Sequence, residues 1–126
     1  MTSALPIARW IVRVDGLIML VLGLLIWTGS FAALVPVHML LGLVLVLALW
    51  VVAYGGYLAR VSSGLVGLAG LWGLLLPILG ITQHGLLAGD LHWLIDVTHL
   101  LVGLAAIGLG EAVGAAIDKR GAPAAR

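Results

Sequence analysis

The stretch THLLVGLAAIGLGEAVG, residues 98–114, contains a histidine that is followed along one helix face by small residues. At helical spacing, the positions on the same face as His99 are i+4, i+7, i+11 and i+15. These positions are occupied by Gly103, Ala106, Gly110 and Gly114. A helix with this face presents an imidazole above a groove without large side chains, which suits a flat ligand or a closely packed neighbouring helix.

The same motif, His-x-x-x-Gly followed by Leu, occurs twice in the chain, at residues 38–42 and 99–103. The first copy begins 22 residues before Arg60, and the second begins 20 residues before Lys119. At 1.5 Å per helical residue, the two imidazoles are therefore predicted to differ in membrane depth by only ~3 Å.

The composition is that of a membrane protein. Of the 126 residues, 63% are hydrophobic and only 9% are charged, which leaves too few polar side chains to cover a water-soluble globule. A hydrocarbon core of ~30 Å needs about 20 apolar residues per helix, and the chain contains four such stretches. The sequence thus predicts an all-α, four-helix transmembrane bundle that forms a single domain over residues 1–126. The predicted helices cover residues 15–34, 37–59, 64–82 and 91–117.

The basic residues predict the orientation of these helices. All six lie in the N-terminal segment, the second connection or the C-terminal segment: Arg9, Arg13, Arg60, Lys119, Arg120 and Arg126. By the positive-inside rule both termini lie in the cytoplasm, and the first and third connections face outward. We therefore expect a multi-pass protein of the prokaryotic inner membrane, whose first apolar stretch is an uncleaved helix and not a signal peptide.

The two halves of the chain are predicted to be parallel helical-hairpin repeats. Gly16-Leu-Ile-Met-Leu near the start of the first helix resembles Gly64-Leu-Val-Gly-Leu at the start of the third, and the histidine motifs open the second and fourth. Parallel repeats imply a pseudo-twofold axis along the membrane normal. His38 and His99 are accordingly expected to face each other near the outer side of the membrane.

Two neutral imidazoles that face each other at one depth are typical of bis-histidine haem ligation. In this hypothesis His38 and His99 bind the iron, while Gly42, Gly103 and Ala106 leave room for the porphyrin. The chain has no cysteine, which excludes iron–sulfur clusters and redox-active thiols. Any redox chemistry must therefore come from a bound cofactor.

Two other hypotheses stay open. The histidines and glycines could serve helix packing alone in a cofactor-free accessory subunit, and the lack of an outer Lys or Arg to pair with haem propionates favours this alternative. In the third hypothesis, His38, His99 and Asp96, joined by His84, form an outer-face site for a single transition-metal ion or for transport. If haem is bound, Asp96 is instead expected to accept the proton of the second ring nitrogen of His99. His84 and His92 would be available to donate hydrogen bonds to haem propionates.

Two carboxylates lie near or within the predicted membrane. Glu111 follows His99 by 12 residues, which places it ~18 Å deeper, so it is a candidate proton relay; an ion pair with Arg13 is the alternative. Asp15 is predicted to lie at the start of the first helix beside Arg13, where the helix dipole favours a carboxylate.

The two His-x-x-x-Gly motifs, on the second and fourth helices of a chain with both termini inside, resemble the small four-helix membrane b-type cytochromes. This resemblance implies a haem b between His38 and His99 and electron transfer between a quinone and an outer-face redox partner. We also expect that the chain forms a homo-oligomer or belongs to a larger respiratory complex. Whether the chain is itself an oxidoreductase or an electron-transfer subunit stays open. Larger members of that group carry two haems on four histidines, whereas all four histidines here lie on the outer side, so at most one haem is implied. Membrane lipid is the expected surrounding, and nothing indicates a nucleic-acid partner.

Overall fold

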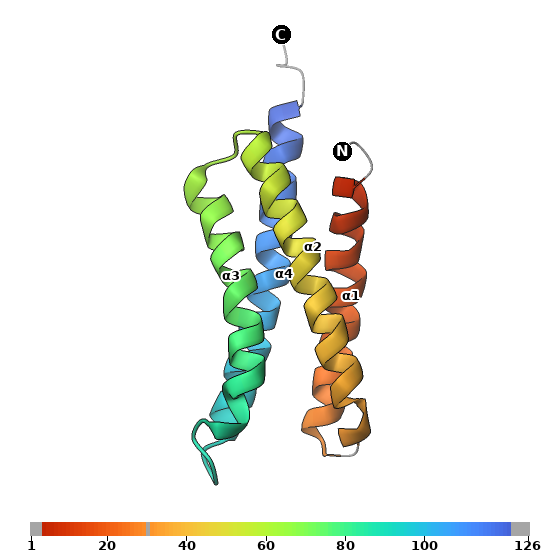
Figure 1. Ribbon diagram of the computed structural model, residues 1–126, viewed down its shortest axis with the longest axis vertical. Coiled ribbons are helices and arrows are strands. Elements are labelled where there is room, and N and C mark those ends of the chain that lie inside the picture. The colour runs from red at the N-terminus through yellow and green to blue at the C-terminus, as the bar shows by residue number, and fades with distance from the viewer. Residues whose placement is uncertain (1–3, 30, 122–126) are drawn as a thin grey trace.

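The structure, a computed structural model, describes residues 4–29 and 31–121. This part of the chain folds into four long helices that form one bundle (Figure 1). The helices are α1 (Ala4–Trp27), α2 (Val35–Leu58), α3 (Ser63–Thr82) and α4 (Trp93–Gly121). The prediction of an all-helical, four-helix fold is confirmed for these residues. Each helix is long and apolar enough to cross a membrane, as a multi-pass protein requires.

The helices pack in sequence order, and α4 also packs against α1 to close the bundle. Across the bundle, α2 contacts α4, whereas α1 and α3 do not touch in the described residues. The helices that carry His38 and His99 are thus the pair that meets along the central diagonal. Each helical hairpin, α1–α2 and α3–α4, contributes one of them.

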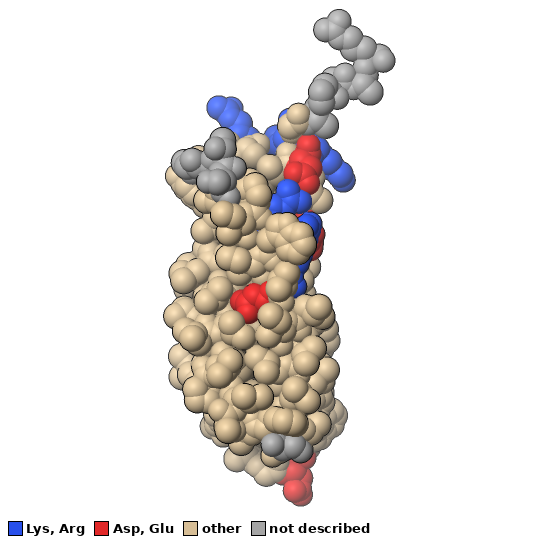
Figure 2. Space-filling view, turned by 90° about the vertical axis from the view of Figure 1, so that its right-hand side faces the viewer, with Lys and Arg blue, Asp and Glu red and all other residues tan. Residues whose placement is uncertain are grey.

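The start of α1 and the end of α4 lie at the same end of the bundle as the α2–α3 connection (Figure 1). In the face shown in Figure 2, every Lys and Arg side chain lies toward this end, and none lies at the opposite end. The opposite end carries the α1–α2 and α3–α4 connections. The two ends of the bundle therefore differ both in charge and in the connections that they carry.

Helix α1 differs most from its predicted range, because it begins at Ala4 and not at residue 15. The prediction was wrong here because basic residues were taken to mark the membrane boundary. Instead, Arg9 and Arg13 lie inside the helix and form ion pairs with two carboxylates of α4. A partner on another helix lets a charged side chain enter an apolar helix, and sequence spacing does not show that partner.

The other end of α1 lies at Trp27 and not at residue 34. Gly29 follows with a φ of +76°, a left-handed conformation that residues with a Cβ rarely adopt and that commonly ends helices. A 3-10 turn, η1 (Ala32–Leu34), then leads into α2, where Pro36 lies in the first turn. The remaining helices match their predicted ranges to within a few residues.

The buried core occupies only part of the length of the bundle. Among the described residues, no position of α1 beyond Gly16, of α2 before Leu45, of α3 beyond Gly73 or of α4 before Ala106 is buried. We name the part that contains the core the basic half (residues 4–16, 45–73 and 106–121). The rest is the histidine half (residues 17–44 and 74–105).

The basic half is held together by close packing of aliphatic side chains against glycine. Leu49, Val12 and Val113 are fully buried or nearly so. A Cβ on Gly56 would lie 2.6 Å from Cγ1 of Val113, and a Cβ on Gly110 would lie 2.8 Å from Cγ1 of Val12. In a membrane, moving apolar side chains from lipid to a helix interface changes the free energy little. Close approach of the helix backbones is therefore a main source of helix association there.

Two tryptophans connect neighbouring helices by hydrogen bonds. The indole Nε1 of Trp50 in α2 donates to the carbonyl oxygen of Gly70 in α3 at 3.1 Å. Trp72 in α3 donates to the carbonyl oxygen of Val102 in α4 at 2.9 Å. These bonds satisfy indole groups that would otherwise lose a partner in an apolar environment.

Candidate functional site: a facing histidine pair

The structure brings His38 and His99 together across the central diagonal. Their ring centroids lie 6.2 Å apart, and the ring planes are tilted by 50°. His38 lies in the first turns of α2 and His99 in the second turn of α4, and both helices run from the histidine half toward the basic half. Side chains on a helix lean toward its N-terminus, so both rings lean the same way, into the half without a buried core.

The ring nitrogens of this pair lack protein partners. Nδ1 of His38 and Nδ1 of His99 are buried and make no hydrogen bond. In the part of the chain that the structure describes, the other buried side-chain atoms of this kind are the two carboxylate oxygens of Asp15. Burying a polar atom without a hydrogen-bond partner costs free energy, and such atoms are rare in native proteins. The histidine pair is therefore one of two places, with Asp15, where the described bundle has polar capacity to bind another group.

Each imidazole packs against a glycine on the preceding helix. A Cβ on Gly23 of α1 would lie 3.5 Å from Cε1 of His38, and a Cβ on Gly80 of α3 would lie 3.6 Å from Cε1 of His99. The two hairpins thus repeat one arrangement, in which a glycine on the first helix makes room for a histidine on the second. Neither glycine was singled out in the sequence, because their proximity to the rings depends on how the helices pack.

Of the three small residues that were predicted to leave room for a porphyrin, two are instead used in helix packing. A Cβ on Gly42 would lie 3.1 Å from Cε of Met19, so this glycine serves the packing of α1 on α2. Ala106 is 1% exposed and belongs to the core of the basic half. A Cβ on Gly103 would meet no atom within 4 Å, so space remains at this position alone of the three. The physical reason is the lean of the histidine rings, which takes them away from residues one turn further along their own helices.

The separation of the rings fits ligation of one metal centre from both sides. Metal–nitrogen bonds of ~2.0 Å on opposite sides of a metal place two imidazole centroids roughly 6 Å apart. The observed 6.2 Å agrees with this separation. Each ring also keeps an Nδ1 atom without a protein partner. In residue type and ring separation, the pair fits a bis-histidine group.

The remaining histidines form a second, more exposed pair in the α3–α4 connection. The rings of His84 and His92 are 6.4 Å apart and nearly parallel. Nδ1 of His92 lies 3.1 Å from the carbonyl oxygen of Leu86, and Nε2 lies 3.8 Å from Oδ1 of Asp96. Asp96 thus lies against His92, and it is not hydrogen-bonded to Nδ1 of His99. Over residues 4–29 and 31–121, no three His, Asp or Glu side chains are grouped closely enough to hold a metal ion.

Glu111, the candidate proton relay, is engaged in an ion pair in the basic half. Arg13 donates from Nε to Oε1 of Glu111 at 2.7 Å and from Nη2 to Oε2 at 2.8 Å. Arg9 and Asp118 form a second such pair, with two hydrogen bonds of 2.9 Å. Arg9 lies one helical turn before Arg13, and Asp118 lies two turns after Glu111. These two-bond ion pairs fasten α1 to α4, because both carboxylate oxygens are used in each.

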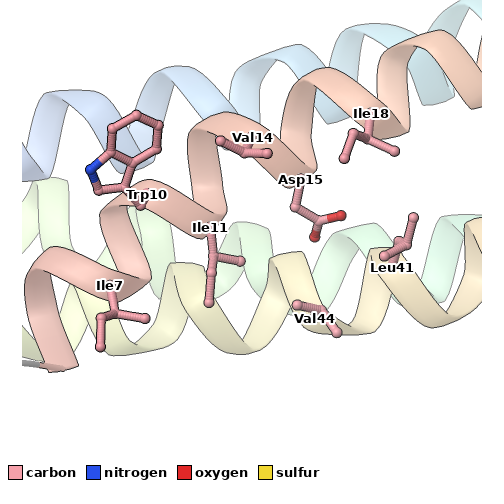
Figure 3. Close-up of a pocket in the computed structure, with 8 residues that line it drawn as sticks. All are labelled: Ile7, Trp10, Ile11, Val14, Asp15, Ile18, Leu41 and Val44. Atoms are coloured by element: carbon pink, nitrogen blue, oxygen red, sulfur yellow. The ribbon is translucent and has the colours of Figure 1, made fainter.

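Asp15 lies in surroundings that the sequence did not predict. Because α1 begins at Ala4, Asp15 lies well inside the helix and not at its start, and Arg13 bonds to Glu111 instead. The Asp15 side chain is directed toward α2 (Figure 3), the residue is 6% exposed, and neither oxygen has a hydrogen-bond partner. A carboxylate within an apolar helix is a functional candidate by default. From the sequence, Asp15 was not predicted to be one, because this residue was placed at the start of the helix.

Fold and site together define a class of protein: a four-helix bundle whose helices can each cross a membrane, with a histidine pair between its two hairpins. Comparison of the chain with protein-family models, with curated proteins and with solved structures finds no match. Support for a function therefore comes from the geometry of the chain itself.

Proposed function

We propose that this protein is a membrane b-type cytochrome that carries electrons through one haem b held between His38 and His99. The observation that supports this most directly is the pair of imidazoles, 6.2 Å apart, whose buried Nδ1 atoms have no protein partner. Histidines from different helices of a bundle are an established way to hold haem iron. When bound, the haem would supply reversible one-electron chemistry.

The residues of the chain have separate tasks in this proposal. His38 and His99 hold the iron, and Gly23 and Gly80 let the backbones of α1 and α3 approach the imidazoles closely. Every residue within four positions of His38 along the chain is apolar, and within four positions of His99 only Asp96 and Thr98 are polar. A hydrophobic shell of this kind limits the access of water to a site. Of Gly42, Gly103 and Ala106, only Gly103 has open space beside it that a cofactor could use.

The equivalent contacts Gly23–His38 and Gly80–His99 also support the proposal that the hairpins are parallel repeats. The distribution of Lys and Arg supports an orientation with both termini in the cytoplasm of a prokaryotic cell. The haem would then lie near the outer face of the inner membrane. From there it could exchange electrons with a membrane quinone or an outer-face redox partner, either alone, as a homo-oligomer or within a larger respiratory complex.

The test is an absorption spectrum of the purified full chain, produced with an ample supply of haem. We expect a Soret band and a sharpened α-band on reduction. Both bands should be lost in His38→Ala and in His99→Ala, and free imidazole added to either variant should restore them, which a purely structural role would not allow. The matched control is His84→Ala, which removes a histidine of the same half and should leave the spectrum unchanged.

A chain that stays colourless with ample haem, or a His99→Ala variant with an unaltered spectrum, would contradict the proposal. A colourless protein that co-purifies in fixed ratio with larger subunits would support the accessory-subunit alternative. Zinc or copper in place of iron on elemental analysis would support the metal-site alternative.

A further inference from the structure

A groove with a single polar residue lies on the surface between α1 and α2, apart from the histidine pair (Figure 3). Its volume is about 480 Å³, within the usual range for sites that bind small molecules. Asp15 borders it with both carboxylate oxygens covered, so its surface is apolar. Seven apolar side chains form this surface: Ile7, Trp10, Ile11, Val14, Ile18, Leu41 and Val44. Trp10, Val14 and Ile18 are exposed, so the groove opens toward the surroundings of the bundle.

In residues 4–29 and 31–121, no cation is paired with Asp15. It is 94% buried, and neither of its oxygens accepts a hydrogen bond. The other charged side chains of α1, Arg9 and Arg13, are bonded to Asp118 and Glu111 of α4. Helix α2, which forms the other wall of the groove, contains no Lys, Arg, Asp or Glu. The described part of the chain therefore places a carboxylate in apolar surroundings and pairs no Lys or Arg with it.

This arrangement favours a particular ligand chemistry. A carboxylate in a medium of low polarity is strongly stabilised by a cation, and an apolar groove stabilises the hydrophobic groups that such a cation carries. The indole of Trp10 lies in the same groove and adds a ring face that attracts cations. A neutral hydrocarbon would leave the carboxylate without a partner, and an anion would be repelled.

We propose that the groove beside Asp15 is a binding site for a lipophilic organic cation, such as an amphiphilic amine or a phosphonium, which enters from the membrane. The two oxygens are covered by neighbouring side chains, so the ligand reaches them by displacing aliphatic groups such as Ile18 and Leu41. The site is independent of the histidine pair and does not rest on haem binding.

The experiment uses the full chain in detergent micelles and two probes of the same shape and opposite charge. Tetraphenylphosphonium and tetraphenylborate are each measured by equilibrium dialysis against empty micelles. We expect the wild-type chain to bind the phosphonium beyond micelle partition and to show no such excess for the borate. Asp15→Asn should weaken phosphonium binding about tenfold or more, and Asp15→Glu should retain most of it.

Asp90→Asn, which removes a carboxylate from the α3–α4 connection, is the matched control and should bind like the wild type. A second test leaves Asp15 in place: Ile18→Trp fills the groove from an exposed position and should also abolish phosphonium binding. Helical content by circular dichroism shows whether each variant is folded. Equal binding of the phosphonium by the wild type and Asp15→Asn, or wild-type binding no greater than that of empty micelles, would overturn the proposal.

Discussion

The two halves of this bundle are made from the same four helices but are stabilised in different ways. In the basic half, side chains such as Leu49 and Val113 are fully buried, glycines allow close approach, and two ion pairs fasten α1 to α4. In the histidine half, no described residue is buried, and α2 and α4 meet at two imidazoles with unused nitrogens. Protein packing thus accounts for the fold of one half, whereas the described chain leaves the side chains of the other half incompletely buried.

Because of this difference, substitutions in the two halves should affect stability and ligand binding to different degrees. A half that is closely packed is sensitive to changes of side-chain volume, because its neighbours have little room to adjust. A half without a buried core should tolerate such changes and should respond mainly at the residues that bind a ligand. Matched substitutions in the two halves test this division directly.

The largest effect is expected when the same residue type is truncated in each half of α2. Leu49 is 0% exposed in the basic half, and Leu40 is 63% exposed in the histidine half. Leu49→Ala should lower the free energy of unfolding by about 2–5 kcal/mol through the cavity that it leaves. Leu40→Ala, which removes lipid-facing surface, should change it by less than about 0.5 kcal/mol. Unfolding by SDS in mixed micelles, followed by tryptophan fluorescence, measures both, and equal losses would show that the halves are not packed differently.

An intermediate effect is expected when glycine is enlarged in each half. A Cβ on Gly56 would lie 2.6 Å from Cγ1 of Val113 and 3.1 Å from Cγ2 of Val66, and these β-branched side chains cannot move away easily. Gly56→Ala should therefore destabilise the bundle by about 1–3 kcal/mol in the same unfolding assay. Gly103→Ala meets no atom within 4 Å and should be neutral or slightly stabilising, because alanine favours a helix.

The Gly103→Ala variant also tests whether this position borders the proposed cofactor. A Gly103→Ala protein that is stable without haem but takes up less of it would show that this position borders the cofactor. A loss of stability as large as that of Gly56→Ala would contradict the open space that the structure gives Gly103.

The sequence alone predicted the number of helices and most of their limits, because apolar length is a local property that lipid thickness constrains. It failed for the start of α1, where the membrane boundary was inferred from Arg9 and Arg13. The partners of these residues, Asp118 and Glu111, lie at the far end of the chain, and no local pattern links them.

The site was predictable in the same uneven way. The repeated motif and the matched depth singled out His38 and His99, since both signals are carried by spacing along single helices. The glycines that contact the rings lie on α1 and α3, and which residues of two helices touch depends on their relative rotation. For the same reason, the sequence could not show that Asp15 faces a groove.

The smallest effect is expected from the ion pair between Arg13 and Glu111, whose side chains are 46% and 41% exposed. Arg13→Gln and Glu111→Gln should each lower stability modestly, because each leaves one charge without its partner in a helix that crosses the membrane. The double variant should recover most of the loss, and a mutant cycle in the unfolding assay measures this coupling. Singles and double that lose stability additively would show that the pair contributes nothing as a pair.

The same cycle separates the structural role of Glu111 from its candidate role as a proton relay. If the carboxylate serves only to hold α1 against α4, the double variant should reduce its haem with a quinol at the wild-type rate, because the stability of the contact is restored without the charge. If Glu111 also passes protons, Glu111→Gln and the double variant should be slowed equally, whatever their stability, and Arg13→Gln should not. The ion pair would then be the one place where the basic half takes part in the chemistry of the histidine half.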